Sequence, residues 1–186
     1  MNLIQESQKA NKNAYKELVE KYNYIFYKFA RIYFISDNDV YQVLQKVLTR
    51  VYSEIINCKT EHEFICFTLK YLLVDCQKLA ELNKKDVDKK IESKTITVDI
   101  TNRVGSSSTN LDNIDYQNYR KASLVEEYLT IIEPQYRALA YFYYYANLTV
   151  KEISVIMKKS ESSLNADLDK IRIKIYEMIK NKEVDL

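Results

Sequence analysis

Apolar residues recur every three or four positions through the first 82 residues, the spacing that places them on one face of an α-helix. The pattern predicts one helix that begins near Ala14 and a second that follows the N-cap candidate Ser36. Thr60 and Glu63 have the spacing of a capping box, which predicts the start of a third helix. The apolar stripe of the second helix consists of Val40, Val43, Leu44, Val47, Val51 and Ile55. Residues 1–82 are therefore expected to form one small helical domain.

The periodicity stops between residues 83 and 121, where the sequence becomes polar and charged. This stretch includes NKKDVDKKIESK and GSSSTNLDN, and it holds the single glycine of the chain, Gly105. Residues 96–100, ITVDI, alternate like a strand, but a lone strand without a partner is better interpreted as extended coil. Residues 83–121 are therefore predicted to be a polar linker, with room for short helical pieces, between two domains.

A helical pattern returns over residues 122–186. Ser123 and Glu126 have capping-box spacing, and Pro134 suits the first turn of a helix. This segment is predicted to be a second helical domain.

The last two predicted helices are joined by a short turn. Thr149 and Glu152 form a further capping box, which opens a short helix through Met157. Ser160 is then the cap of a longer final helix that ends near Ile179. A short helix, a tight turn and a longer helix predict a helix-turn-helix.

The composition favours an all-helical architecture. One glycine and one proline in 186 residues leave little material for the tight turns that sheets need. Hydrophobic residues make up 47% of the chain, enough for a real core. The predicted fold class is all-α, with two small helical domains joined by a polar linker and a C-terminal helix-turn-helix. The net charge of +2 means that any nucleic-acid surface must be a local patch.

Cysteine usage and apolar runs bear on location. The three cysteines, Cys58, Cys66 and Cys76, are odd in number and lack disulfide-framework spacing, which favours a reducing cytoplasm. The N-terminal MNLIQESQKANKN lacks the apolar core of a signal peptide. No stretch approaches the ~18 apolar residues of a membrane span. We therefore expect a cytoplasmic protein with no membrane insertion.

Three segments carry a family resemblance. Residues 39–55, DVYQVLQKVLTRVYSEI, follow the pattern D-A-E-D-L-V-Q-E-V-F-x-x-V-W at Asp39, Val43, Leu44, Gln45, Val47, Leu48, Val51 and Tyr52. Residues 132–175 follow L-P-P-x-x-R and then L-S-x-x-E-I-A-x-x-L-x-I-S-E-G-T-V-K-S-R-L-x-R-A-R at Pro134, Arg137, Leu148, Glu152, Ile153, Ser160, Glu161, Leu168 and Arg172. Residues 15–34 are similar to the opening helix of the same family. Over nearly its whole length the chain thus resembles the extracytoplasmic-function sigma factors of bacterial RNA polymerase.

The resemblance implies a function and a set of partners. The chain would be a transcription initiation factor that binds core RNA polymerase and confers promoter recognition, with no catalysis of its own. Its partners would be core RNA polymerase and promoter DNA, with an anti-sigma factor as a further partner in many members. The resemblance implies no cofactor, no metal and no small-molecule substrate.

The resemblance also implies three groups of contact residues. The helix that binds core polymerase would use Asp39, Gln42, Gln45, Lys46 and Arg50. The minus-ten promoter element would be bound by Asn57, Lys59, His62, Phe64, Lys70 and Lys78. The minus-thirty-five element would be bound by Lys158, Lys159, Ser160, Ser162, Ser163, Asn165, Lys170 and Arg172.

Three charged residues keep a second hypothesis open. Lys46 reverses the charge of an acidic family position, and Asp167 and Asp169 lie in the predicted recognition helix. An acid that faces phosphate weakens DNA binding, although an aspartate can also accept a hydrogen bond from cytosine. The chain could instead be a degenerate sigma-like interaction protein that binds protein partners without reading promoters. A helix-turn-helix regulator is a further alternative, but such regulators usually bind as symmetric dimers and no dimerisation helix is evident.

Two other residue sets have a chemical and a structural interpretation. Cys58, His62 and Cys66 are four residues apart and could hold zinc on one continuous helix. The capping box at Thr60 starts that helix after Cys58, so the three residues would not share a helix face. We therefore prefer the interpretation that they are small buried residues without a metal. The run Tyr141–Tyr145 could stack on bases, but consecutive residues point all around a helix, so we expect packing roles for most of them.

Overall fold

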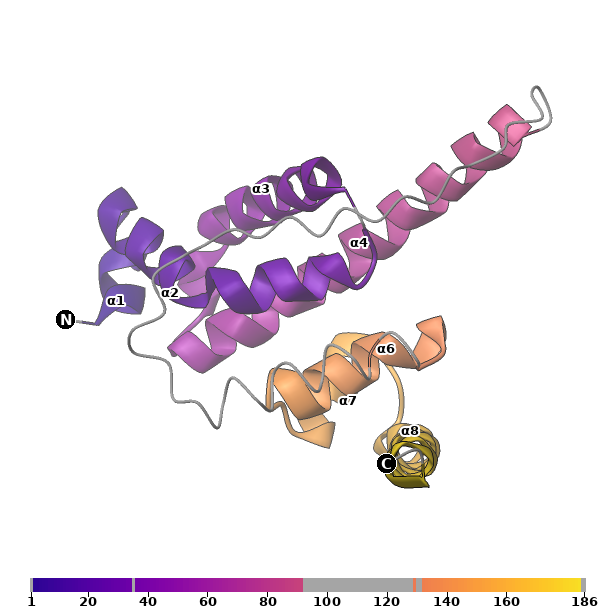
Figure 1. Cartoon of the computed structure of the whole chain (residues 1–186). Helices are drawn as coiled ribbons and strands as arrows, with labels where there is room; N and C mark the ends of the chain where they lie inside the picture. Colours follow the sequence, from indigo (N-terminus) through magenta and orange to yellow (C-terminus); the bar gives the residue numbers. More distant parts are fainter. Residues whose placement is uncertain (1, 35, 92–128, 130–131, 185–186) are drawn as a thin grey trace.

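All the regular structure is helical in the computed structural model of the chain, which describes residues 2–34, 36–91, 129 and 132–184 (Figure 1). The predicted all-α class is confirmed. Helices α1 to α4 form an N-terminal half, and α6 to α8 form a C-terminal half. Within these described residues, no helix has both the length and the apolar character that a membrane crossing requires.

The N-terminal half begins with a helix that the apolar pattern did not predict. The side chain of Asn2 caps α1 (Leu3–Gln8), which is too short for a period to show in the sequence. Ala10 then takes a left-handed φ of 62°, which separates α1 from the next helix. The side chain of Asn11 caps α2 (Lys12–Arg31), whose start lies close to the predicted position.

The second predicted helix is present as α3 (Asp37–Ser53). Its apolar stripe is buried as expected, and the last member, Ile55, lies in the short 3₁₀ turn η1 (Ile55–Asn57). Ser36 occupies the N-cap position, but its side chain makes no capping hydrogen bond.

The third predicted helix, α4 (Glu61–Ile91), starts at the expected cap. The backbone N–H of Glu63 donates to the Thr60 hydroxyl at 3.1 Å, as in a capping box. The Glu63 carboxylate, however, accepts from the backbone N–H of Lys59 at 2.7 Å rather than from that of Thr60. The return hydrogen bond of the capping box is therefore made to the residue before the N-cap, Lys59, instead of to Thr60 itself. The helix still begins after Cys58.

Helix α4 runs further than the sequence pattern predicted. It continues through residues 83–91, which were expected to begin the linker. This stretch contains four lysines, which are good helix formers, and aspartates that lie three or four residues from them and can pair with them along a helix. The helix can therefore continue although the apolar stripe has ended. The remaining linker residues 92–121, with the ITVDI segment and the capping box at Ser123, lie outside the described residues.

The C-terminal half starts with α6 (Pro134–Ala140), which has its proline in the first turn as predicted. A five-residue π-helical segment, η2 (Tyr141–Tyr145), continues it directly. The capping box predicted at Thr149 is confirmed, and it opens α7 (Val150–Met157). Helix α8 (Glu161–Val184) completes the fold.

The connection between α7 and α8 is as short as predicted. Lys158 takes a left-handed φ of 54° and ends α7. The Ser160 hydroxyl accepts from the backbone N–H of Ser163 at 3.2 Å, which confirms Ser160 as a cap. Helix α8 then continues past its predicted end at Ile179. The two helices and the tight turn that a helix-turn-helix requires are therefore in place.

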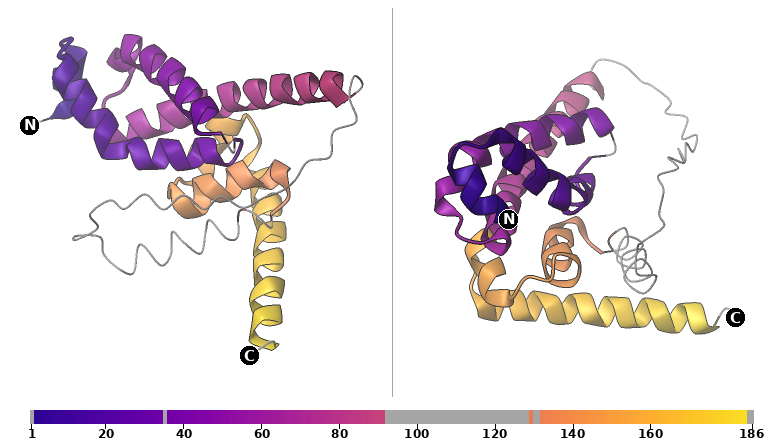
Figure 2. Two further views of the ribbon diagram at one scale, coloured as in Figure 1. Left: turned by 45° about the horizontal axis from the view of Figure 1, so that its top comes forward. Right: turned by 90° about the vertical axis from the view of Figure 1, so that its left-hand side faces the viewer.

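The two halves pack against each other through aromatic residues. The ring of Phe142 stacks on that of Phe29 with centroids 5.0 Å apart, and the Tyr141 hydroxyl donates to the Ile25 carbonyl at 2.7 Å. Tyr141 and Phe142 are both buried, so packing is their role in this arrangement. Helices α4 and α7 are also in contact, and buried residues of both halves form one apolar cluster. Helix α8 leads away from this common body (Figure 2).

Candidate functional site

The polar side of α3 faces solvent. Gln42, Gln45, Lys46 and Arg50 are exposed, while Asp39 in the first turn is half-buried. The apolar residues between them point into the core, as the 3.6-residue period requires. The face predicted to bind core polymerase is thus accessible to a protein partner.

The two cations on this face are already held by carboxylates of the chain. Lys46 Nζ lies 2.9 Å from Oδ1 of Asp75, whose side chain is only 9% exposed. Arg50 Nε lies 3.2 Å from the Glu54 carboxylate, and its guanidinium sits 3.9 Å above the Tyr71 ring. Hydrogen bonds from Tyr71 and then from Arg50 hold the pKa of the Glu54 carboxyl below its usual value. The face therefore presents ion pairs rather than isolated positive charge.

One residue predicted to contact the minus-ten element is misplaced for that role. Phe64 is fully buried, with ring centroids 5.7 Å from Phe26 and 6.1 Å from Tyr15. The minus-ten contact that the resemblance implies for Phe64 does not fit this arrangement, because the position lies on the core-facing stripe of α4. Phe67 is half-buried and packs edge-on against Tyr71 at 5.0 Å.

The other minus-ten candidates do not share one face of α4. Asn57, Lys59, His62 and Lys78 are exposed, and Lys70 is half-buried. His62, Lys70 and Lys78 follow one another at eight-residue intervals, so each is turned about 80° around the helix from the one before. These residues are therefore scattered over the surface and do not form a continuous basic strip.

The start of α8 has the exposure that a recognition helix needs. Ser162, Ser163 and Asn165 are exposed, whereas Leu164 and Leu168 are buried against the body. Polar side chains therefore line the outer side of the first turns. Before them, an exposed pair of lysines and an exposed serine occupy the turn; these are Lys158, Lys159 and Ser160.

Two aspartates of α8 pair with cations that were predicted to contact the minus-thirty-five element. Asp167 is only 9% exposed, and its carboxylate lies 3.5 Å from Lys159 Nζ and 3.3 Å from Lys170 Nζ. Asp169 is exposed and lies 2.7 Å from Arg172. The expectation that Asp167 faces DNA, as a repulsive or cytosine-reading acid, was wrong because its side chain turns toward the body. It acts instead as an internal counter-ion.

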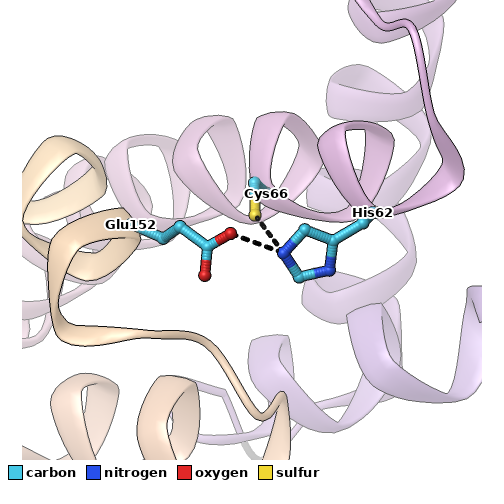
Figure 3. Close-up of side chains that lie close together, drawn as sticks. All are labelled: His62, Cys66 and Glu152. Atoms are coloured by element: carbon cyan, nitrogen blue, oxygen red, sulfur yellow. Dashed lines mark hydrogen bonds and ion pairs between the residues drawn. The ribbon is translucent and has the colours of Figure 1, made fainter.

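A histidine, a cysteine and a glutamate meet where α4 contacts the start of α7 (Figure 3). His62 Nε2 lies 2.6 Å from Glu152 Oε1 and 3.8 Å from Cys66 Sγ. One ligand atom from each residue lies within 4.8 Å of the others. The second carboxylate oxygen of Glu152 accepts from the backbone N–H and from the hydroxyl of Thr149, both at 2.8 Å. We call these three residues the His-Cys-Glu group.

The electrostatic state of the group follows from its partial burial. Burial, together with the nearby Glu152 carboxylate, raises the pKa of the Cys66 thiol to about 11. Burial also acts to raise the pKa of Glu152, but hydrogen bonds from Thr149 and His62 outweigh it, and the net pKa is lower than usual. At neutral pH Glu152 is therefore a carboxylate and Cys66 is a protonated thiol.

Sequence reasoning found two members of this group and missed the third. Cys58, which was considered as a zinc ligand with His62 and Cys66, is buried at the end of η1 and does not belong to the group. Glu152 takes that place, 90 positions from His62 along the chain. It was recognised in the sequence only as a capping residue, and no local spacing could have linked it to α4.

The fold is similar to that of a solved structure. CnrH, in complex with the cytosolic domain of CnrY, matches with a TM-score of 0.61 over 96% of this chain and 96% of that chain, at 13% sequence identity. CnrH is an extracytoplasmic-function sigma factor, so the chain has a fold like that of this class. A scan against protein families found no match, and a search of curated proteins found none. At 13% identity the likeness is one of fold.

Proposed function

We propose that the protein is a sigma-type transcription initiation factor that binds core RNA polymerase in the cytoplasm, directs it to promoters and catalyses no reaction itself. The observation that carries the proposal is the likeness to CnrH over 96% of both chains, which includes both helical halves. The accessible polar sides of α3 and α8 are the two surfaces that this function needs.

In this proposal α3 binds the polymerase and α8 reads the upstream promoter element. An asparagine can make two hydrogen bonds to adenine in the major groove, which is the role we assign to Asn165. Ser162 and Ser163 contact base edges or phosphate nearby, and Lys158 and Lys159 bind phosphate and set the register.

The packed halves must separate when the protein reads both promoter elements. The minus-ten and minus-thirty-five elements lie about 25 base pairs apart, which is about 85 Å of DNA at 3.4 Å per base pair. Helix α4, with 31 residues, is about 46 Å long at 1.5 Å per residue, so even this long helix covers little more than half of that distance. The contacts of Phe142 with Phe29 and of Tyr141 with Ile25 therefore belong to a closed state that promoter binding opens.

An anti-sigma partner is part of the proposal. CnrH was solved in complex with the cytosolic domain of CnrY, and we extend this kind of pairing to the present chain. A regulatory protein that binds and stabilises the closed state would keep the chain away from polymerase.

A second candidate is a sigma-like protein that binds partners without reading DNA. It is favoured by the internal ion pairs of the predicted DNA-binding cations Lys159, Lys170 and Arg172. Such a protein would bind core polymerase or a regulator, and the binding would depend little on salt because few phosphate contacts would form.

The test is transcription in vitro with purified core polymerase and fragmented genomic DNA, followed by mapping of transcript starts. Under the proposed function, starts appear only when the protein is added, and they share two spaced upstream motifs. Core binding in a pull-down without any starts would favour the second candidate. If the chain neither bound core polymerase nor produced starts, the proposed function would be contradicted, and the second candidate would remain only as a protein that binds a regulator.

A further inference from the structure

We infer that His62, Cys66 and Glu152 form a binding site for one zinc-class divalent cation that links the N-terminal half of the chain to the C-terminal half. His62 and Cys66 lie four residues apart on α4 and therefore share a face of that helix. Glu152 comes from the first turn of α7. The three side chains converge from two separate elements, as Figure 3 shows.

The distances in the His-Cys-Glu group, from 2.6 Å to at most 4.8 Å, bracket those of a tetrahedral site. Zinc binds histidine nitrogen, thiolate sulfur and carboxylate oxygen at about 2.0–2.3 Å, which places neighbouring ligand atoms about 3.3–3.6 Å apart. His62 Nε2 and Cys66 Sγ are 3.8 Å apart, so a cation fits between them with little movement. His62 Nε2 and Glu152 Oε1, at 2.6 Å, form a direct hydrogen bond that the cation would replace. Their separation would have to grow by about 0.7 Å, a small side-chain rotation.

The chemistry of the ligand set selects the cation. One imidazole, one thiolate and one carboxylate carry two negative charges in the bound form, which balance a divalent ion. The thiolate favours zinc and cobalt over magnesium and calcium, which prefer oxygen ligands. Three protein ligands leave a fourth position for water. Metal binding releases the thiol proton of Cys66 to solvent.

The surroundings of Glu152 orient it for this role. Its Oε2 is held by two hydrogen bonds from Thr149, so Oε1 is directed toward His62 and Cys66. Support of a ligating carboxylate by hydrogen bonds to its other oxygen is a common feature of metal sites. The capping box therefore serves two purposes: it starts α7, and it positions a ligand.

A cation at this position would stabilise the closed state, because it would bond to α4 and α7 at once. This consequence for promoter binding rests on the proposed function, whereas the metal binding itself does not. A bound ion would lower the fraction of molecules in which the halves are apart, and so it would lower promoter affinity. The chain would then respond to the supply of zinc-class metal directly, through its own residues.

The experiment is a cobalt titration of the full, reduced, metal-free chain, read by absorption. The inference predicts one Co²⁺ per chain, a thiolate-to-cobalt charge-transfer band in the near ultraviolet, intense visible bands of tetrahedral cobalt, and loss of both on addition of Zn²⁺. Cys66→Ser should abolish the charge-transfer band, and His62→Gln and Glu152→Gln should each weaken binding at least tenfold. Cys58→Ala is the matched thiol control and should keep the full spectrum. Circular dichroism confirms that each variant is helical.

Hydrogen exchange tests the link between the halves. Zn²⁺ should slow exchange of the α7 amides in the wild-type chain and not in Glu152→Gln. Lys151→Ala changes an exposed residue of the same helix start that touches no member of the His-Cys-Glu group, so it should retain the zinc effect. Equal zinc effects in wild type and Glu152→Gln would overturn the inference, as would the absence of stoichiometric cobalt binding or a charge-transfer band that survives in Cys66→Ser.

The outcomes separate this inference from the proposed function. A cobalt site that depends on all three residues, in a chain that starts no transcription, would support the site and contradict the function. Promoter-specific starts from a chain that binds no cobalt would support the function and contradict the site.

Discussion

Replacement of Asp167 by asparagine should strengthen DNA binding, because it removes the counter-ion of two lysines. Asp167 is nearly buried between Lys159 at 3.5 Å and Lys170 at 3.3 Å, and both lysine side chains are largely exposed at their other sides. The amide keeps the size of the carboxylate and loses its charge. Since each ion pair has an exposed partner, their loss should cost about 1 kcal/mol of unfolding free energy in total.

The effect on DNA can be worked out from the number of cations released. Each additional phosphate contact steepens the slope of log K against log salt by about 0.9, so two freed lysines steepen it by up to about 1.8. Between 50 and 200 mM salt, that change makes the gain in affinity about tenfold larger at the lower concentration.

Fluorescence anisotropy of a labelled duplex over a salt series measures both the DNA affinity and the slope of log K against log salt. Asp75→Asn is the matched control: Asp75 is also a nearly buried acid paired with a lysine, Lys46, but it lies on α4 in the N-terminal half. It should leave the salt slope unchanged. An unchanged or shallower slope for Asp167→Asn would refute the reasoning, because the two lysines would then not face DNA.

Three further predictions concern stability. Phe142→Ala should cost about 3–5 kcal/mol in urea unfolding, since the ring is fully buried and stacks on α2, whereas Tyr144→Ala, at a position 38% exposed, should cost about 1 kcal/mol or less; equal losses would contradict the described packing. Thr149→Ala should cost about 1 kcal/mol by removing the cap of α7, and an unchanged melting temperature would show that the capping box does not stabilise the fold. Burial raises the thiol pKa of Cys58 to about 11 and of Cys76 to about 12, so the unfolded chain loses these protons first and stability should fall as pH rises from about 9 toward 12; urea midpoints that stay level over this range would contradict it.

The helices with a strong local signal could be predicted from the sequence. The buried stripe of α3 follows directly from apolar spacing, and the start of α7 follows from the capping box at Thr149. Helix α1 was missed because six residues carry no visible period. The end of α4 was predicted too early, because residues 83–91 are helical although their sequence has no apolar stripe. A repeat of apolar residues shows which helix face is buried, so a helix without such a face leaves no repeat in the sequence.

The candidate site was less predictable, because its geometry depends on contacts between distant segments. The resemblance implied a promoter contact for Phe64, although its position on the α4 stripe puts it in the core. It placed Asp167 toward DNA, whereas the side chain turns inward to two lysines. Glu152 joins His62 and Cys66 only because α7 packs on α4, and no pattern within either helix encodes that contact.

The most direct test of the central claim is to map transcript starts with core polymerase for the wild-type chain and for Asn165→Ala side by side. The account predicts wild-type starts that share two spaced motifs, and for Asn165→Ala a change confined to the upstream motif, since Asn165 lies on the exposed side of α8. The absence of protein-dependent starts from the wild-type chain would contradict the claim that this protein directs polymerase to promoters.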